Sequence, residues 1–277
     1  MRVRVVLAAM AVAAVFAGAA EAAPRYTALG DSFAAGPLIP NPLAPLGCLK
    51  SSNNYGRIAQ RTLLYAEYRD ATCSGAETED MTQPQNVSPG PNPPQLDSLS
   101  ADTQLVTITI GGNDIGFSEL AENCVSLLPF GSPCRNRYVR DGNDEISDRI
   151  EATAPKVAAV IAGIRGRSPA AQVLVLNYSA IFPHAPSTGC WPRMPVTPRD
   201  VAWLRAKHEE LNAMLARQAT ANEAVLVDVY GASVGRDACA GSLTRWVEPY
   251  VPTNAAAPLH PNLRGMQAMA AMVVARR

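Results

Sequence analysis

The stretch RYTALGDSFAAG, residues 25–36, decides the fold and raises the question of function. Its first five residues form a largely apolar run that predicts a buried strand. Gly30 tolerates positive φ, and Asp31 and Ser32 are residue types that cap helices, so this segment fits a strand-to-helix turn. The same residues also fit a nucleophile loop, in which the strand presents the Ser32 hydroxyl at its carboxyl end. The rest of the chain must distinguish these two interpretations.

Strand-like and helix-like segments alternate along the rest of the chain. Short apolar runs bounded by turn residues predict parallel strands buried on both faces, at residues 25–29, 68–71, 105–110, 172–178 and 224–230. Helical spacing predicts helices at residues 54–65 and 143–165, and others that begin near 197 and 262. Pro155 is expected to kink or split the second of these helices. This order predicts one domain, a three-layer α/β/α sandwich with a mainly parallel five-stranded sheet.

Three small-residue loops follow predicted strands. They are GDS at 30–32, CSGAET at 73–78 and GGNDIGF at 111–117, and a fourth segment, LHPN at 259–262, precedes the last helix. In open α/β sheets, ligands bind beyond the carboxyl ends of the strands. We therefore expect all four segments to meet at one edge of the sheet.

Acyl transfer needs a hydroxyl, a nearby base and donors for the developing oxyanion. Ser32 supplies the hydroxyl, and the chain has three histidines as candidates for the base. His208 falls on the apolar face of a predicted helix and is expected to be a packed core residue. His184 falls in a loop, either on the surface or against substrate. His260 lies between Pro258 and Pro261, which restrict its backbone, and it is the predicted base.

The predicted oxyanion donors are the backbone N–H of Ser32, the backbone N–H of Gly75 and the side-chain amide of Asn113. Gly75 has no side chain to block close approach of a substrate. Asn113, which follows two glycines, would also be an ordinary turn residue. A nucleophile of the α/β-hydrolase type would require G-x-S-x-G, but Ala34 occupies the last position of that motif.

The four segments together resemble the conserved blocks of the GDSL, or SGNH, hydrolase family. GDSFAAG resembles the first block, CSGAET the second, GGNDIGF the third and LHPN the last, so Ser32, Gly75, Asn113 and His260 match the four residues that name the family. The resemblance implies an SGNH-hydrolase-like fold and hydrolysis of carboxylic esters through an acyl-enzyme on Ser32, with His260 as general base. It implies no cofactor and no metal.

One position departs from the family pattern. The family usually has an Asp three residues before the histidine, and this chain has Ala257 there. Either a backbone carbonyl near Ala257 orients the ring, which would make a Ser-His dyad, or a remote carboxylate such as Asp228 or Asp237 does so. We favour the carbonyl, since it needs no rearrangement and a neutral acceptor can still orient imidazole.

The chain has six cysteines, an even number that favours three disulfides over a metal site. The sequence has no C-x-x-C, and no histidine lies within four residues of a cysteine. Six cysteines allow 15 pairings, which the sequence does not resolve. The pattern resembles that of secreted actinobacterial lipases and esterases, and this resemblance implies the pairs Cys48–Cys73, Cys124–Cys134 and Cys190–Cys239.

Residues 1–22 have the pattern of an export signal. Arg2 and Arg4 precede an apolar stretch from 5 to 20, and Ala20-Glu21-Ala22 matches a small-x-small cleavage site. Cleavage would leave a catalytic domain of residues 23–277, secreted or associated with the cell envelope; an uncleaved anchor is the alternative. No later segment is apolar enough to span a membrane.

The net charge of the chain limits the classes of partner that it could bind. The chain has 24 basic and 24 acidic residues, so it has no polycationic surface for nucleic acid or anionic lipid. We expect a monomer. We expect its substrate to be a small-molecule or lipid ester, and the apolar loop PLIPNPLAPL at 37–46 favours a lipid-like one. An acyltransferase or carbohydrate acetylesterase that uses the same site, and a non-catalytic surface-binding module, are the alternative functions.

Overall fold

Five parallel strands form one sheet in the order β2-β1-β3-β6-β7. The computed structural model describes residues 25–277 apart from 132, 186 and 188, so the predicted export signal lies outside the described residues. The strands are β1 (Arg25–Gly30), β2 (Glu67–Asp70), β3 (Thr103–Thr109), β6 (Gln172–Leu176) and β7 (Val225–Val227). The predicted α/β fold with a parallel five-stranded sheet is confirmed.

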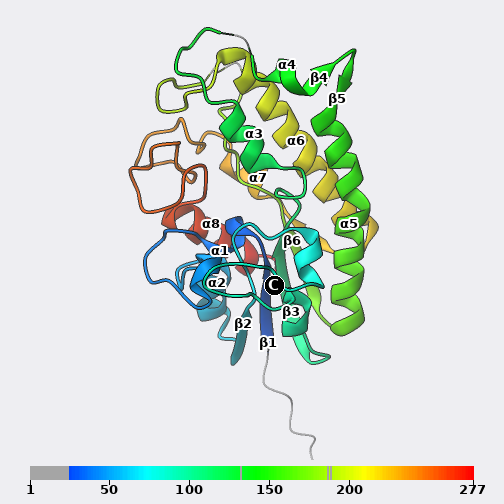
Figure 1. Ribbon diagram of the computed structural model, residues 1–277. Coiled ribbons are helices and arrows are strands. Elements are labelled where there is room, and N and C mark those ends of the chain that lie inside the picture. The colour runs from blue at the N-terminus through cyan, green and yellow to red at the C-terminus, as the bar shows by residue number, and fades with distance from the viewer. Residues whose placement is uncertain (1–24, 132, 186, 188) are drawn as a thin grey trace, which may run out of the picture.

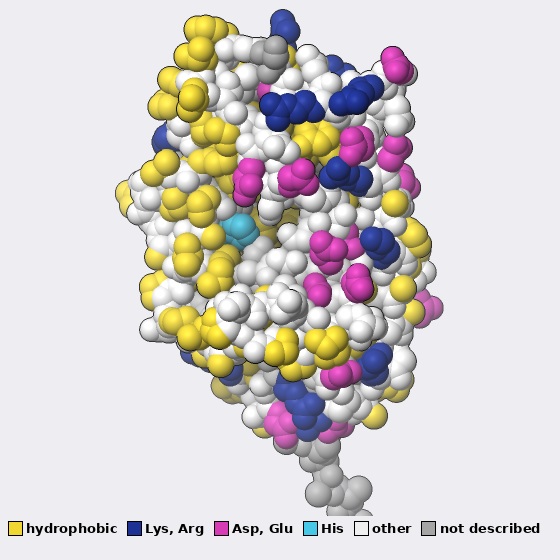
Figure 2. Space-filling view, viewed as in Figure 1, with side chains coloured by type: hydrophobic (Ala, Val, Ile, Leu, Met, Phe, Trp, Pro, Cys, Tyr) yellow, Lys and Arg dark blue, Asp and Glu magenta, His cyan; other side chains and the backbone are white. Residues whose placement is uncertain are grey.

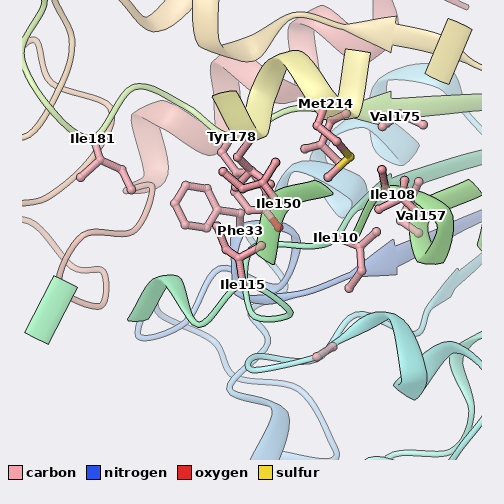
Figure 3. Packing of buried hydrophobic residues seen from close by; sticks show 14 of the residues in the cluster. Phe33, Ile108, Ile110, Ile115, Ile150, Val157, Val175, Tyr178, Ile181 and Met214 are labelled. Carbon is pink, nitrogen blue, oxygen red and sulfur yellow. The ribbon is translucent and has the colours of Figure 1, made fainter. Parts of the chain in front are cut away.

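Two pairs of helices cover the two faces of the sheet (Figure 1). The helices are α5 (Glu145–Arg167) and α6 (Pro198–Ala221) on one face, and α2 (Tyr55–Leu63) and α8 (Leu263–Val274) on the other. Figure 3 shows Ile108 of β3, Val157 of α5 and Met214 of α6 gathered in the first of these layers. Tyr26 of β1 and Met266 of α8 belong to the second.

Short elements connect this framework. They are α1 (Ser32–Ala35), α3 (Phe117–Asn123), α4 (Arg135–Tyr138), α7 (Val229–Ser233), a hairpin of β4 (Val139–Arg140) and β5 (Asn143–Asp144), and 3₁₀ turns at Leu46–Cys48, Thr78–Met81 and Gln95–Ser98. In the part of the chain that the structure describes, none of the helices has both the length and the apolar character needed to cross a membrane.

Two predicted elements differ from the structure. Helix α5 continues through Pro155, so the expected split is wrong. The carbonyl that loses its helical donor belongs to Glu151, which is exposed to solvent, while Ile150 and Val157 on either side pack into one core. The predicted strand 224–230 was too long, because Asp228 ends it by capping α7 through the N–H of Gly231 at 3.0 Å.

Gly30 fixes where β1 delivers the nucleophile loop. Its φ is +129°, and a Cβ there would lie 2.4 Å from the carbonyl oxygen of Thr109 on β3, so only glycine fits. The side-chain amide of Gln95 closes this region by pairing with both the N–H (2.7 Å) and the carbonyl (3.0 Å) of Gly30. The backbone that leads into Ser32 is therefore held in a fixed position at the carboxyl edge of the sheet.

Candidate active site

Ser32 and His260 meet at the carboxyl edge of the sheet, although 228 residues separate them in the chain. The Oγ of Ser32 lies 2.7 Å from Nε2 of His260. Ser32 is the first residue of α1, and Asp31 caps that helix by accepting the N–H of Phe33 at 2.9 Å. His260 lies in the loop before α8, just before the capping residue Asn262. The helix ends on either side thus hold the hydroxyl against the ring.

The carbonyl that faces the other ring nitrogen of His260 is that of Pro258, at 2.7 Å from Nδ1. The expectation of the Ala257 carbonyl was one residue off: that oxygen accepts the backbone N–H of His260 at 3.2 Å. The reason is a tight turn, in which Leu259 has a φ of +61° and aims the Pro258 carbonyl at the ring.

The two carboxylates considered for this role bond elsewhere. Asp228 accepts the side-chain amide of Asn177 at 2.9 Å and caps α7. Asp237 accepts the N–H of Cys239 at 2.9 Å. Among the described residues, the hydrogen-bond partners of the His260 ring are Pro258 and Ser32.

These contacts define the protonation of the ring. A carbonyl oxygen only accepts, so Nδ1 carries the hydrogen and the lone pair of Nε2 faces the Ser32 hydroxyl. Burial lowers the pKa of His260, and the bond to the Pro258 carbonyl opposes this in part. The ring is therefore neutral at pH 7 and is able to take the proton of Ser32.

The candidate oxyanion donors are held by a second set of contacts. Asn113 lines the same pocket as Ser32 and His260, and its Nδ2 donates one hydrogen to the carbonyl of Ala76 at 2.9 Å, leaving the other. Asp114 fixes the same loop by accepting the N–H of Thr78 at 3.0 Å. Gly75 precedes Ala76 and has a φ of +81°, but it is not among the residues that line the pocket.

A buried network that the sequence analysis missed ties two of the loops together. The hydroxyl of Tyr178 donates to Asp31 Oδ2 at 2.5 Å and accepts the N–H of Gly112 at 2.7 Å. Burial raises the pKa of Asp31 to about 7, although the bonds from Tyr178 and Phe33 oppose the shift. The only sequence signal was a tyrosine at the end of the predicted strand 172–178.

A second missed residue, Glu248, holds the loop of His260. Its backbone N–H donates to the carbonyl of His260 at 3.0 Å. Its fully buried carboxylate pairs with Arg245 at 2.8 Å and accepts Asn262 Nδ2 at 2.7 Å. Burial would raise the pKa of Glu248, but these and neighbouring donors outweigh it and lower the pKa to about 2. An isolated glutamate 12 residues before His260 gave no signal for this role.

A pocket of about 350 Å³ opens beside Ser32. Figure 2 shows a hollow in the face of the molecule that Figure 1 presents. Much of the lining is apolar or aromatic: Phe33, Phe117, Ala121, Ile181, Leu211 and Tyr250. This is the size and character of a site for a small, largely apolar ligand.

The other histidines take no part in the contact with Ser32. His208 is 2% exposed, packs between Phe117 and Tyr230 and also borders the pocket. Burial lowers its pKa to about 3, so it stays neutral. His184 is exposed and is not among the lining residues. Within the described ranges, no group of three or more His, Cys, Asp or Glu side chains could hold a metal ion.

The described residues contain three disulfides: Cys48–Cys73, Cys124–Cys134 and Cys190–Cys239. They are the pairs that the family resemblance implied. The first anchors the segment before Gly75, where the N–H of Ser74 also donates to the carbonyl of Cys48 at 3.0 Å.

A serine hydroxyl bonded to a histidine, beside an amide donor and an apolar pocket, is the arrangement of a hydrolase with a serine nucleophile. The model of the GDSL-like lipase/acylhydrolase family matches residues 28–268, and the chain belongs to this family. The predicted enzyme class, a carboxylic ester hydrolase, is thereby confirmed.

Known relatives agree with this assignment. The chain is 38% identical to Lipase 2 of Streptomyces coelicolor, over 92% of this chain and 86% of that protein. The crystal structure of an extracellular lipase from Streptomyces rimosus is 26% identical, with a TM-score of 0.74 over 92% of this chain and 99% of that one. A phospholipase A1 from Streptomyces albidoflavus, 24% identical, shares the fold with a TM-score of 0.75 over 92% of this chain and 99% of that one.

Proposed function

We propose that Ser32 and His260 form a catalytic dyad that hydrolyses lipid-like carboxylic esters. The observation that carries the proposal is the 2.7 Å contact between Ser32 Oγ and His260 Nε2 at the wall of an apolar pocket. This distance is within reach for proton transfer, and the ring has the protonation state of a base.

The reaction follows from these contacts. Ser32 Oγ attacks the ester carbonyl while Nε2 of His260 takes its proton, and the carbonyl oxygen gains the negative charge. The N–H groups of Ser32 and Gly75 and the amide of Asn113 stabilise that charge. His260 then protonates the leaving alcohol. In the second half, His260 takes a proton from water as the water oxygen attacks the acyl-enzyme carbonyl, and it returns that proton to Ser32 Oγ as the bond to the acyl group breaks and the acid leaves. No cofactor or metal is needed for any step.

The pocket supports an acyl chain as the group bound beside Ser32. Phe33 and Tyr250 offer aromatic surface, and Ile181 and Leu211 offer aliphatic surface. Burying such surface against a hydrocarbon chain is favourable by about 25 cal/mol per Å². Several relatives carry the name lipase, in agreement with this class of substrate.

We also propose that the mature protein is an exported monomer that begins at Ala23. The pattern of residues 1–22, the three disulfides and the extracellular lipase among the relatives support export. N-terminal sequencing of secreted protein tests the cleavage site, and a sequence that begins at Met1 contradicts it. Sedimentation velocity tests the oligomeric state, and a stable dimer contradicts the monomer.

The activity is tested with p-nitrophenyl esters of increasing chain length, beside a phospholipid and an acetylated sugar. We expect hydrolysis that Ser32→Ala and His260→Ala each reduce by about 10⁴-fold or more. Absence of activity in folded, oxidised protein contradicts the proposal. Transfer of the acyl group to an added alcohol in preference to water would instead indicate an acyltransferase.

A further inference from the structure

Large apolar side chains stand out from the surface beside the pocket. We call this set the apolar rim, and it consists of Val125, Leu127, Leu128, Phe130, Trp191 and Val251. Leu127 is 87% exposed, Phe130 71% and Val251 72%. Single exposed apolar residues are ordinary, but a group of them around one opening marks an interaction site.

The apolar rim is continuous with the wall of the pocket. Ala121 and Glu122 of α3 line the pocket, and the chain enters the rim three residues later at Val125. On the facing segment, Tyr250 lines the pocket, donates its hydroxyl to the Ala121 carbonyl at 2.7 Å and directly precedes Val251. The rim therefore borders the entrance through which an ester reaches Ser32.

The loops of the rim are held in place rather than free to fold inward. The Cys124–Cys134 disulfide closes the loop that carries Leu127 and Phe130. Within it, the N–H of Ser126 donates to the carbonyl of Pro195 at 2.6 Å, and Trp191 Nε1 donates to the Ser126 carbonyl at 3.4 Å. These bonds restrain the backbone that carries the exposed side chains of Leu127 and Phe130.

The charged residues around the apolar rim indicate what kind of surface the rim could bind. Residues 123–134 and 249–259, which carry five of the six rim side chains, contain no Asp, Glu, Lys or Arg. Exposed carboxylates lie near the pocket at Glu119 and Glu122 on α3 and at Glu77 and Glu79, while exposed Arg135 and Arg193 flank the rim segments. Figure 2 shows hydrophobic side chains to the left of the hollow, and acidic side chains with Lys and Arg among them above it and to its right. The uncharged rim segments, with carboxylates and arginines both close to them, suit an apolar surface without net charge.

We propose that the apolar rim docks on the surface of an uncharged or zwitterionic lipid aggregate, from which the ester enters the pocket. The inference rests on the proposed function, because it takes the ester to be a lipid. Contact of the rim with the lipid phase lets an acyl chain move from one apolar environment into another without crossing water.

Binding to vesicles tests the proposal directly. The Ser32→Ala protein, which leaves the lipid intact, is mixed with phosphatidylcholine vesicles and the bound fraction is measured by flotation. We expect binding that falls at least about a hundredfold when Leu127→Ser, Leu128→Ser and Phe130→Ser are combined. Leu64→Ser is the matched control: Leu64 is 81% exposed at the end of α2, before the amino end of β2, and its replacement leaves binding unchanged.

A second measurement separates docking from catalysis. With Ser32 intact, the combined rim variant keeps kcat/KM for the soluble ester p-nitrophenyl acetate within about twofold, but loses hydrolysis of emulsified ester. If soluble esters are not hydrolysed by the unaltered protein, the proposed function fails. Vesicle binding by the Ser32→Ala protein still decides the role of the rim as a lipid-docking surface.

Three results overturn the proposal. The first is equal vesicle binding by the rim variant and the protein with an intact rim. The second is tighter binding when phosphatidylglycerol replaces half of the phosphatidylcholine. The third is a concentration-dependent dimer that the rim substitutions abolish, without vesicle binding, which would make the rim an interface between two copies of the chain.

Discussion

His260 is oriented by the carbonyl of Pro258, and this choice of acceptor has chemical consequences. A carbonyl and a carboxylate both fix the tautomer with hydrogen on Nδ1. The carbonyl carries no full charge, so it stabilises the imidazolium less than a carboxylate would. The bond to the Pro258 carbonyl therefore only partly opposes the effect of burial, which lowers the pKa of His260 below its ordinary value of 6.5, and the neutral base persists into mildly acidic solution.

The dyad predicts that no remote carboxylate is essential. We expect Asp228→Asn and Asp237→Asn to keep kcat/KM within a few-fold, because neither side chain bonds to His260. The acid limb of the kcat/KM profile should have its midpoint below pH 6.5, since protonation of His260 removes the base. Rates across pH for the three proteins measure both. A folded carboxylate variant as inactive as His260→Ala contradicts the dyad.

Asn113 supplies the side-chain donor of the proposed oxyanion site. We expect Asn113→Ala to lower kcat by about 10²–10³ with little change in KM, since the bond strengthens as charge develops on the substrate. Steady-state kinetics measures this, and Asn222→Ala, at the end of α6, is a control that removes an asparagine far from the pocket. An unchanged kcat for a folded Asn113→Ala protein excludes the role.

At the level of elements, apolar runs were sufficient to predict β1, β3 and β6, because strands buried on both faces need continuous apolar sequence. Local patterns predicted their ends less well. Asp228 shortened β7 by capping α7, and the four-residue hairpin β4–β5 is too short to have an apolar period. The Ser-Gly-Asn-His residues were visible as motifs, but the Tyr178 bridge and the Pro258 carbonyl depend on contacts between distant segments and on one positive φ.

The three disulfides should differ in their contribution to stability. Cys190–Cys239 spans 49 residues, Cys48–Cys73 spans 25 and Cys124–Cys134 spans 10. Closing a longer loop removes more entropy from the unfolded chain, so replacing each pair by alanine should cost about 4.1, 3.5 and 2.7 kcal/mol respectively. Urea unfolding of the three double variants measures these losses. The reverse order contradicts the loop-entropy account.

At the scale of the whole molecule, two buried groups, His208 and Asp31, make the folding stability depend on pH in opposite directions. His208 is buried and neutral, with a pKa lowered to about 3 from 6.5 by burial. The stability it contributes is present above pH 6.5 and is lost as the pH falls toward 3. Asp31 has a pKa raised from 3.8 to about 7, mainly by burial. Its contribution is present in full below pH 3.8 and is lost as the pH rises through 7.

Between about pH 4 and 6.5, the two groups therefore offset each other. Each changes the free energy of unfolding by about 1.4 kcal/mol per pH unit, with opposite sign. Relative to the unaltered protein, the free energy of unfolding of the His208→Met variant should rise by about 3 kcal/mol as the pH falls through this range, because only the Asp31 contribution remains. The free energy of unfolding of the Asp31→Asn variant should fall by a similar amount over the same range, because only the His208 contribution remains. Urea unfolding at several pH values measures the slopes, and differences from the unaltered protein isolate one group at a time. Parallel slopes in all three proteins would mean that neither group titrates in the folded state as its burial requires.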